Sequence, residues 1–191
     1  MNSSKIKLVF KILLYVILAF VCNQIVQQIF PGLDIYPDFF FVLIWTFSYF
    51  HKIEWSLLLA VISGLFRDIL FGQVFGLSII LGILGAYLAS HLLQFVWQQR
   101  IRFLPVQVLL VSLIIKFLET ISLNIVTMFK FSETFLLNQV FISYRYQIPS
   151  YIGLNFIATV ICYILINHVF PFEKMEKDVY AENMLNLNGE F

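Results

Sequence analysis

Long apolar runs separated by short polar segments divide this chain into six candidate membrane-spanning segments. A bilayer core of about 30 Å requires roughly 20 helical residues at a rise of about 1.5 Å each. The segments run over Lys7–Ile29, Pro37–Phe50, Trp55–Phe71, Val74–Trp97, Phe103–Phe129 and Tyr151–Phe170. The second segment is short, so we expect it to tilt little, to extend into the residues before it, or to enter and leave the membrane from one side. The pattern predicts an all-α, polytopic fold that forms one domain over residues 1–172.

The polar residues outside these runs form one long connection and one tail. Residues Lys130–Ser150 are predicted to be the only loop of any size, and residues 173–191 form an acidic C-terminal tail that is either solvated or a docking peptide. The basic N-terminus before the first apolar run is also typical of a signal peptide. Because this run is long and lacks a small-residue cleavage site, we interpret it as an uncleaved first helix.

The distribution of basic residues predicts the orientation in the membrane, because cytoplasmic segments carry an excess of Lys and Arg. With the N-terminus inside, the outer segments contain only Lys130 and Arg145. The basic residues on the inner side are Lys5, Lys7, Lys11, Lys52, Arg100, Arg102, Lys174 and Lys177. Both termini are therefore expected in the cytoplasm.

The composition supports a membrane protein and excludes several other classes. Hydrophobic residues make up 61% of the 191 residues and charged residues only 12%, against roughly 25% charged residues in soluble domains. The net charge of +1 gives no indication of nucleic-acid binding. The three histidines, His51, His91 and His168, lie far apart without metal-ligand spacing, and the serines lack a nearby base. We therefore expect no metal, no cofactor and no catalysis.

Four charged residues lie deep within the predicted spans, away from their first few residues, where an ionised group is costly unless it is paired. They are Arg67, Asp68, Lys116 and Glu119. Asp68 and Lys116 each lie 13 residues after the predicted start of their segment, so they reach the same depth. We predict that Asp68 pairs with Lys116, or Arg67 with Glu119, between the third and fifth helices. Such a pair either fixes helix register or forms part of a site for a substrate or a partner helix.

Glycines are concentrated in the third and fourth segments and the turn between them. They are Gly64, Gly72, Gly76, Gly82 and Gly85. Small residues allow membrane helices to approach closely, so these positions predict either tight internal packing or a groove for the helix of another protein. Gly72 is predicted to lie in the turn, where its first role is backbone conformation.

The order of several of these residues resembles a known family. Pro37-Asp38 opens an apolar segment that contains Trp45, and it is followed by Gly64, Asp68, Gly72, Gly76-Leu77 and Ala86-Tyr87-Leu88. This pattern, over Pro37–Gln98, resembles the rod shape-determining protein MreD family. Arg67 is not part of the usual pattern of the family.

The resemblance implies a small protein of the bacterial inner membrane with a six-helix fold similar to the substrate-binding subunits of energy-coupling-factor transporters. It implies a non-enzymatic scaffold without a cofactor, which binds MreC, a bitopic protein with a periplasmic domain. Through the cell-elongation complex it implies contact with RodA, its penicillin-binding transpeptidase and MreB filaments, in support of peptidoglycan synthesis and cell shape. The candidate residues for partner binding or helix packing are Gly64, Arg67, Asp68, Gly72, Gly76, Gly82, Gly85, Lys116 and Glu119.

Two other functions remain open at the level of sequence. A substrate-binding membrane subunit of a vitamin or metal transporter would share the fold, and an enzyme acting on lipid-linked substrates would need converging polar residues. A transporter subunit requires a polar, ligand-sized pocket near the outer surface. A scaffold is expected to fill that space with Phe and Leu and to keep an apolar groove facing the lipid.

Overall fold

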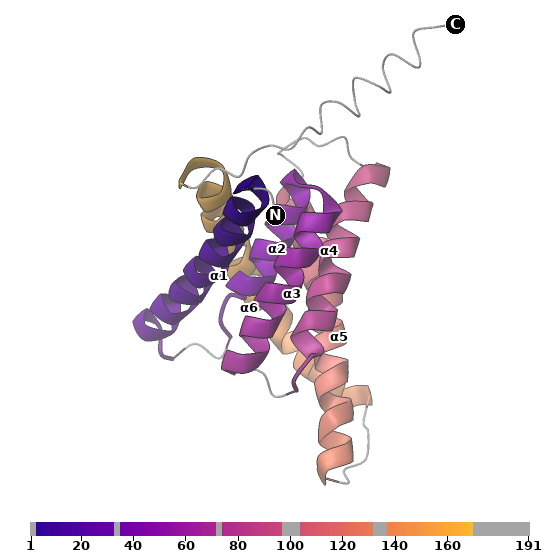
Figure 1. Ribbon diagram of the computed structural model, residues 1–191. Helices are drawn as coiled ribbons and strands as arrows, with labels where there is room; N and C mark the ends of the chain where they lie inside the picture. Colours follow the sequence, from indigo (N-terminus) through magenta and orange to yellow (C-terminus); the bar gives the residue numbers. More distant parts are fainter. Residues whose placement is uncertain (1–2, 33–34, 72–73, 97–103, 132–136, 170–191) are drawn as a thin grey trace, which may run out of the picture.

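Six α-helices make up the fold in the computed structural model, which describes residues 3–32, 35–71, 74–96, 104–131 and 137–169. They are α1 (Ser3–Ile29), α2 (Phe39–Phe50), α3 (Ile53–Phe71), α4 (Leu77–Val96), α5 (Leu104–Phe131) and α6 (Leu137–Ile164), which continues into a π-helical turn, η2 (Leu165–Val169). Figure 1 shows them as one bundle. The described residues contain no strand, and the prediction of an all-α fold with six helices is confirmed.

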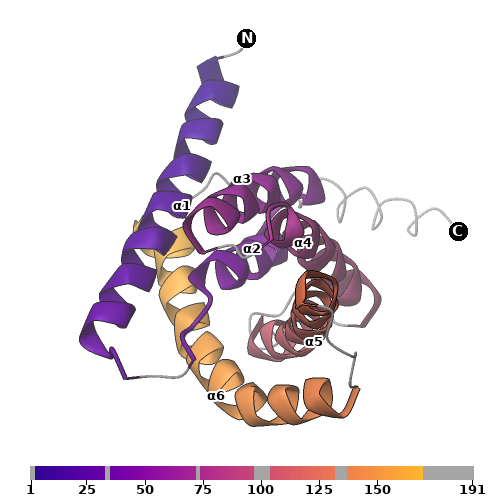
Figure 2. The same cartoon turned by 90° about the horizontal axis from the view of Figure 1, so that it is seen from below.

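Helix α2 lies in the centre of this bundle. It packs against α1, α3, α4, α5 and α6, and Figure 2 shows it surrounded by them when viewed along the bundle. All residues from Phe39 to Tyr49 are buried, and the sequence of α2 is almost wholly apolar. A helix that is apolar on every side is stable only where protein or lipid covers it completely. Its 12 residues extend about 18 Å, so α2 is a core element that does not cross a bilayer by itself.

Three helices of the described chain are long and apolar enough to cross a membrane. These spans are Val9–Ile29, Leu104–Phe129 and Val140–Val169. Two further helices, Phe39–Phe50 and Leu77–His91, are apolar but shorter. Helix α3 has 19 residues and carries three charged side chains, those of Glu54, Arg67 and Asp68.

One prediction about the connections is wrong. Residues 130–150 were expected to form a loop, but α5 continues to Phe131 and α6 begins at Leu137, so most of this region is helical. The polar residues of this region include Gln and Arg, which are good helix formers, so polarity alone did not indicate a loop here. Pro149 lies inside α6, where it removes one backbone hydrogen bond. Figure 2 shows α6 curving past α5 and α2.

Helices α3 and α4 form a closely packed hairpin because Gly64 has no side chain. A Cβ atom built on Gly64 would lie 2.7 Å from the Cα of Ile79 and 2.8 Å from its backbone nitrogen. The two backbones are therefore in direct contact at this point. Gly72 and the residues of the predicted tail, 173–191, lie outside the described residues.

Candidate functional site

The side chain of Arg67 connects four helices near the α3–α4 turn. Its Nε donates to Oδ2 of Asp38 at 2.9 Å, its Nη1 to Oγ of Ser78 at 2.6 Å, and its Nη2 to Oε1 of Glu119 at 2.5 Å. Asp38 precedes α2, Ser78 lies in the first turn of α4, and Glu119 lies in α5. The planar guanidinium group presents five N–H donors in a fixed geometry, so a single arginine reaches acceptors on several elements.

Local structure fixes the position of Asp38. Its Oδ1 accepts the backbone N–H of Phe41 at 3.2 Å, which makes Asp38 the N-cap of α2. The backbone N–H of Asp38 donates to Oδ1 of Asn155 in α6 at 3.0 Å. The cap leaves Oδ2 of Asp38 directed at Arg67, so the start of α2 is joined to both α3 and α6.

A second cation, Lys116, binds the same glutamate as Arg67. Nζ of Lys116 donates to Oε2 of Glu119 at 3.1 Å within α5, and it lies 5.0 Å from the centre of the Tyr151 ring. The guanidinium carbon of Arg67 lies 4.5 Å from the centre of the Phe41 ring. The side chain of Glu119 is 7% exposed, and those of Arg67 and Lys116 are each 18% exposed. We call Asp38, Arg67, Lys116 and Glu119 the ionic cluster.

Of the two pairings that the sequence predicted, the structure contains Arg67 with Glu119, while Asp68 does not contact Lys116. The carboxylate of Asp68 accepts the backbone N–H of Gly76 at 2.7 Å and that of Ser78 at 3.1 Å. The first backbone N–H groups of a helix lack partners within the helix, and Asp68 supplies acceptors at the start of α4. Equal depth in the membrane was therefore insufficient to predict the partner, because the adjacent turn offers Asp68 two donors.

Gly76 is the glycine that determines the backbone conformation of this turn among the described residues. Its φ angle is +91°, in the region that L side chains rarely adopt, and its N–H is the one bound by Asp68. The sequence had assigned this conformational role to Gly72.

Replacement of Asp68 with alanine is expected to destabilise the protein by about 0.5–2 kcal/mol, because the start of α4 loses two acceptors. Asp68→Asn retains one carbonyl oxygen and is expected to lose less. The measurement is the free energy of unfolding in detergent micelles, followed by tryptophan fluorescence. Equal stability of Asp68→Ala and the unchanged protein would contradict the capping role.

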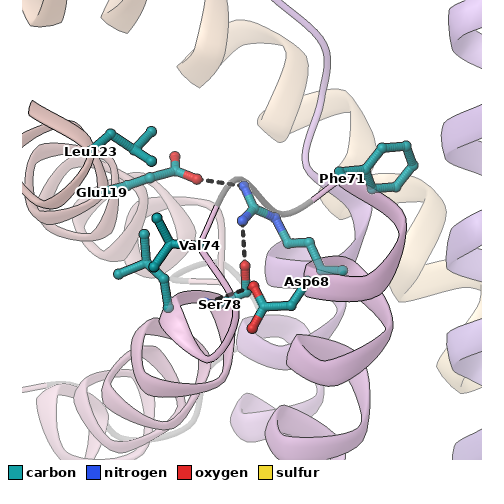
Figure 3. Close-up of a pocket in the computed structure, with 8 residues that line it drawn as sticks. Asp68, Phe71, Val74, Ser78, Glu119 and Leu123 are labelled. Carbon is teal, nitrogen blue, oxygen red and sulfur yellow. Dashed lines mark hydrogen bonds and ion pairs between the residues drawn. The ribbon is translucent and has the colours of Figure 1, made fainter. Parts of the chain in front are cut away.

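A cavity of about 190 Å³ adjoins Arg67 at the end of the bundle where α3 and α4 meet. Its lining residues are Arg67, Asp68, Phe71, Val74, Leu77, Ser78, Glu119 and Leu123. Figure 3 shows the side chains of Glu119 and Ser78 bonded to the arginine, with Val74 and Leu123 beside them. Each oxygen of the two carboxylates in the lining already accepts a hydrogen bond from the chain itself.

The predicted glycine positions that are described in α4 serve contacts within the chain. A Cβ on Gly82 would lie 3.3 Å from the carbonyl oxygen of Ala60, and one on Gly85 would lie 2.5 Å from Nε1 of Trp45. Together with Gly64, these glycines bring α4 close to α3 and to the buried tryptophan of α2. The absence of side chains at these glycines therefore serves packing between helices of this chain.

Sequence reasoning missed three partners of the charged residues: Asp38, Ser78 and Asn155. Asp38 was used in the sequence-based prediction only as part of the Pro37-Asp38 pattern. Its place at the start of an apolar helix is typical of an N-cap, and the second carboxylate oxygen of such a residue is free to bind a cation. The neutral Ser78 and Asn155 gave no signal, because serine and asparagine are common in helices. Among the described residues, no three His, Cys, Asp or Glu side chains are grouped closely enough to hold a metal ion.

The fold and the site define a polytopic helical membrane protein whose core is held by an ionic cluster and closely packed glycines. A family model described as rod shape-determining protein MreD matches residues 4–172. The chain therefore belongs to the MreD family, and its role is that of a rod shape-determining membrane protein. No curated protein and no solved structure matches the chain, so the likeness to substrate-binding transporter subunits stays a prediction.

Proposed function

We propose that this protein is a non-enzymatic scaffold of the cell-elongation complex in the bacterial inner membrane, where it binds an MreC-like protein that crosses the membrane once. The observation that carries this proposal is the filled centre of the bundle. The aromatic side chains of Phe39, Phe40, Phe41, Trp45 and Phe47 are each at most 2% exposed. A bundle filled in this way presents its outer faces, rather than an interior pocket, to other molecules.

The size of the cavity also favours a scaffold over a transporter subunit. Sites for small molecules are commonly about 300–1,000 Å³, whereas the cavity beside Arg67 has about 190 Å³. Its polar groups are bonded to one another through Arg67 and the α4 backbone. A vitamin-sized ligand would have to separate these ion pairs, and a buried charge that loses its partner is costly.

The proposed orientation has both termini in the cytoplasm. The α3–α4 turn, with the ionic cluster near it, then faces the periplasmic side, where the soluble domain of an MreC-like partner lies. The partner's single helix would run along the outer, apolar faces of the bundle. Partner chains such as RodA, its transpeptidase and MreB filaments belong to the proposal only through this complex.

Purification in mild detergent from the cells that encode the protein tests the proposal. An affinity-tagged chain is expected to retain a bitopic MreC-like protein, identified by mass spectrometry, and an unrelated tagged six-helix membrane protein serves as the control. Recovery of transporter ATPase subunits in place of the bitopic protein would overturn the scaffold function and favour the transporter alternative.

A further inference from the structure

The contact between α5 and α6 contains a small, mostly apolar cavity that two polar side chains, those of Ser112 and Asn155, help to line. It has a volume of about 20 Å³ and is lined by Pro105, Val108, Leu109, Ser112, Ile152, Asn155 and Phe156. Leu109 is 39% exposed and Phe156 is 52% exposed, so the cavity lies directly beneath the outer face of the bundle. We call this region the α5–α6 seam.

Two buried polar atoms of the seam have no hydrogen-bond partner in the described part of the chain. They are Oγ of Ser112 and Nδ2 of Asn155, and both residues are 1% exposed. Asn155 lies at the middle of the apolar stretch Val140–Val169, and its Oδ1 already accepts the backbone N–H of Asp38. A buried polar group without a partner destabilises the fold, and lipid chains offer neither a donor nor an acceptor.

Gly153 is a second, independent observation on the same helix. A Cβ added to Gly153 would meet nothing within 4 Å, whereas those added to Gly64, Gly82 and Gly85 would meet the chain's own atoms. Gly153 is exposed and lies one turn before Phe156. Glycine inside a helix is destabilising relative to alanine, and here the fold gains no packing in return. Close approach by a helix from another molecule would use this gap.

We propose that the α5–α6 seam and the adjoining face at Gly153 bind a single transmembrane helix of another protein, which carries a hydroxyl or carboxamide side chain at the level of Asn155. This inference rests on the proposed function, in which the partner crosses the membrane once. The backbone of the partner helix packs over Gly153. Its polar side chain reaches between Leu109 and Phe156, accepts from Nδ2 of Asn155 and exchanges a hydrogen bond with Ser112.

The chemistry of the seam selects this occupant. A hydroxyl or amide group has both donor and acceptor capacity and is small enough for a cavity of this size once the flanking side chains turn aside. A charged side chain would meet no counter-ion among the lining residues. The ionic cluster meets Asn155 through the backbone N–H of Asp38, which donates to Oδ1 of Asn155.

The first test measures retention of the bitopic partner by a Gly153→Leu variant. Leucine blocks the close approach of a helix, so recovery of the partner is expected to fall about tenfold relative to the unchanged chain. The thermal stability of the variant alone is expected to stay the same or to rise, because the added side chain has open space and leucine is a better helix former than glycine. Ile80→Leu on α4, where the replaced residue is 65% exposed, is the control and is expected to retain the partner fully.

The second test places a photo-crosslinking phenylalanine analogue at Phe156, with Tyr87 on α4 as the control position. Illumination of the intact complex is expected to join the bitopic protein to position 156 and not to position 87. Adducts to a second, differently tagged copy of this chain, or only to lipid, would overturn the inference. If the unchanged protein retains no bitopic partner, the proposed function fails; if it does and Gly153→Leu retains it equally, only the seam assignment fails.

Discussion

Replacement of Arg67 with methionine is expected to lower the free energy of unfolding by about 3–5 kcal/mol, because the carboxylates of Asp38 and Glu119 lose their shared cation while they stay buried. Most of the lost stability comes from leaving two buried carboxylates without a cation, and less comes from the hydrogen bonds that Arg67 no longer makes. The measurement is the unfolding of the purified protein in mixed micelles as the denaturing detergent is increased. Loss of less than about 1 kcal/mol would contradict the central role of Arg67.

Two companion variants separate this explanation from a general effect of removing a cation. Lys116→Met is expected to cost less, because Glu119 keeps its bond to Arg67 when Lys116 is absent. Neutralising the acidic partners in the Arg67→Met background, through Asp38→Asn and Glu119→Gln, is expected to restore part of the lost stability. If the triple variant loses as much free energy of unfolding as the three single variants lose in total, the residues do not form an interacting cluster.

A charge-reversal experiment on Arg67 and Glu119 has a different expected result because Arg67 also binds Asp38. Exchange of the two charges, Arg67→Glu with Glu119→Arg, would restore an isolated pair. Here the new glutamate would face Asp38, which binds Arg67 at 2.9 Å. We therefore expect the double reversal to remain strongly destabilised, and this failure is consistent with the pair of Arg67 and Glu119.

Replacement of Gly64 with alanine is expected to cost about 1–3 kcal/mol, although alanine is the better helix former. The added Cβ would lie within 3 Å of the backbone of Ile79 and Ser78, and backbone atoms cannot turn aside as a flexible side chain does. Helices α3 and α4 would have to separate. Gly64→Leu is expected to cost more, since a larger side chain enters the same contact.

Gly153→Ala is the matched control for Gly64→Ala. It makes the same chemical change in a helix, but at a site with nothing within 4 Å, and is expected to raise the free energy of unfolding by up to about 1 kcal/mol. Thermal unfolding in the same detergent measures both variants. Equal effects of the two substitutions would contradict the assignment of Gly64 to a backbone contact.

Residues in helices were predicted well where the apolar pattern was continuous, and poorly where polarity was taken to mean a loop. The start of α1 and the ends of α2 and α3 agree with the apolar runs to within a few residues. The first half of α6 was missed, because its tyrosines, arginine and proline resemble a surface connection. Helix formation there depends on packing against α5, where the hydroxyl of Tyr144 donates to the carbonyl of Leu113 at 2.9 Å.

The sequence by itself determined that this protein lies in a membrane and that its fold is all-helical, because both follow from the composition and from the length of the apolar runs. It also showed that the charges within the spans require partners, because an unpaired charge in lipid is costly. Only the tertiary structure decided which partners the charges take. Arg67 and Asp68 are neighbours in sequence, yet helix geometry directs one toward Asp38 and Glu119 and the other toward the start of α4. Their partners lie on segments far apart in the chain, and the relative position of those segments is fixed by backbone contacts such as that at Gly64, which no local pattern of residues encodes.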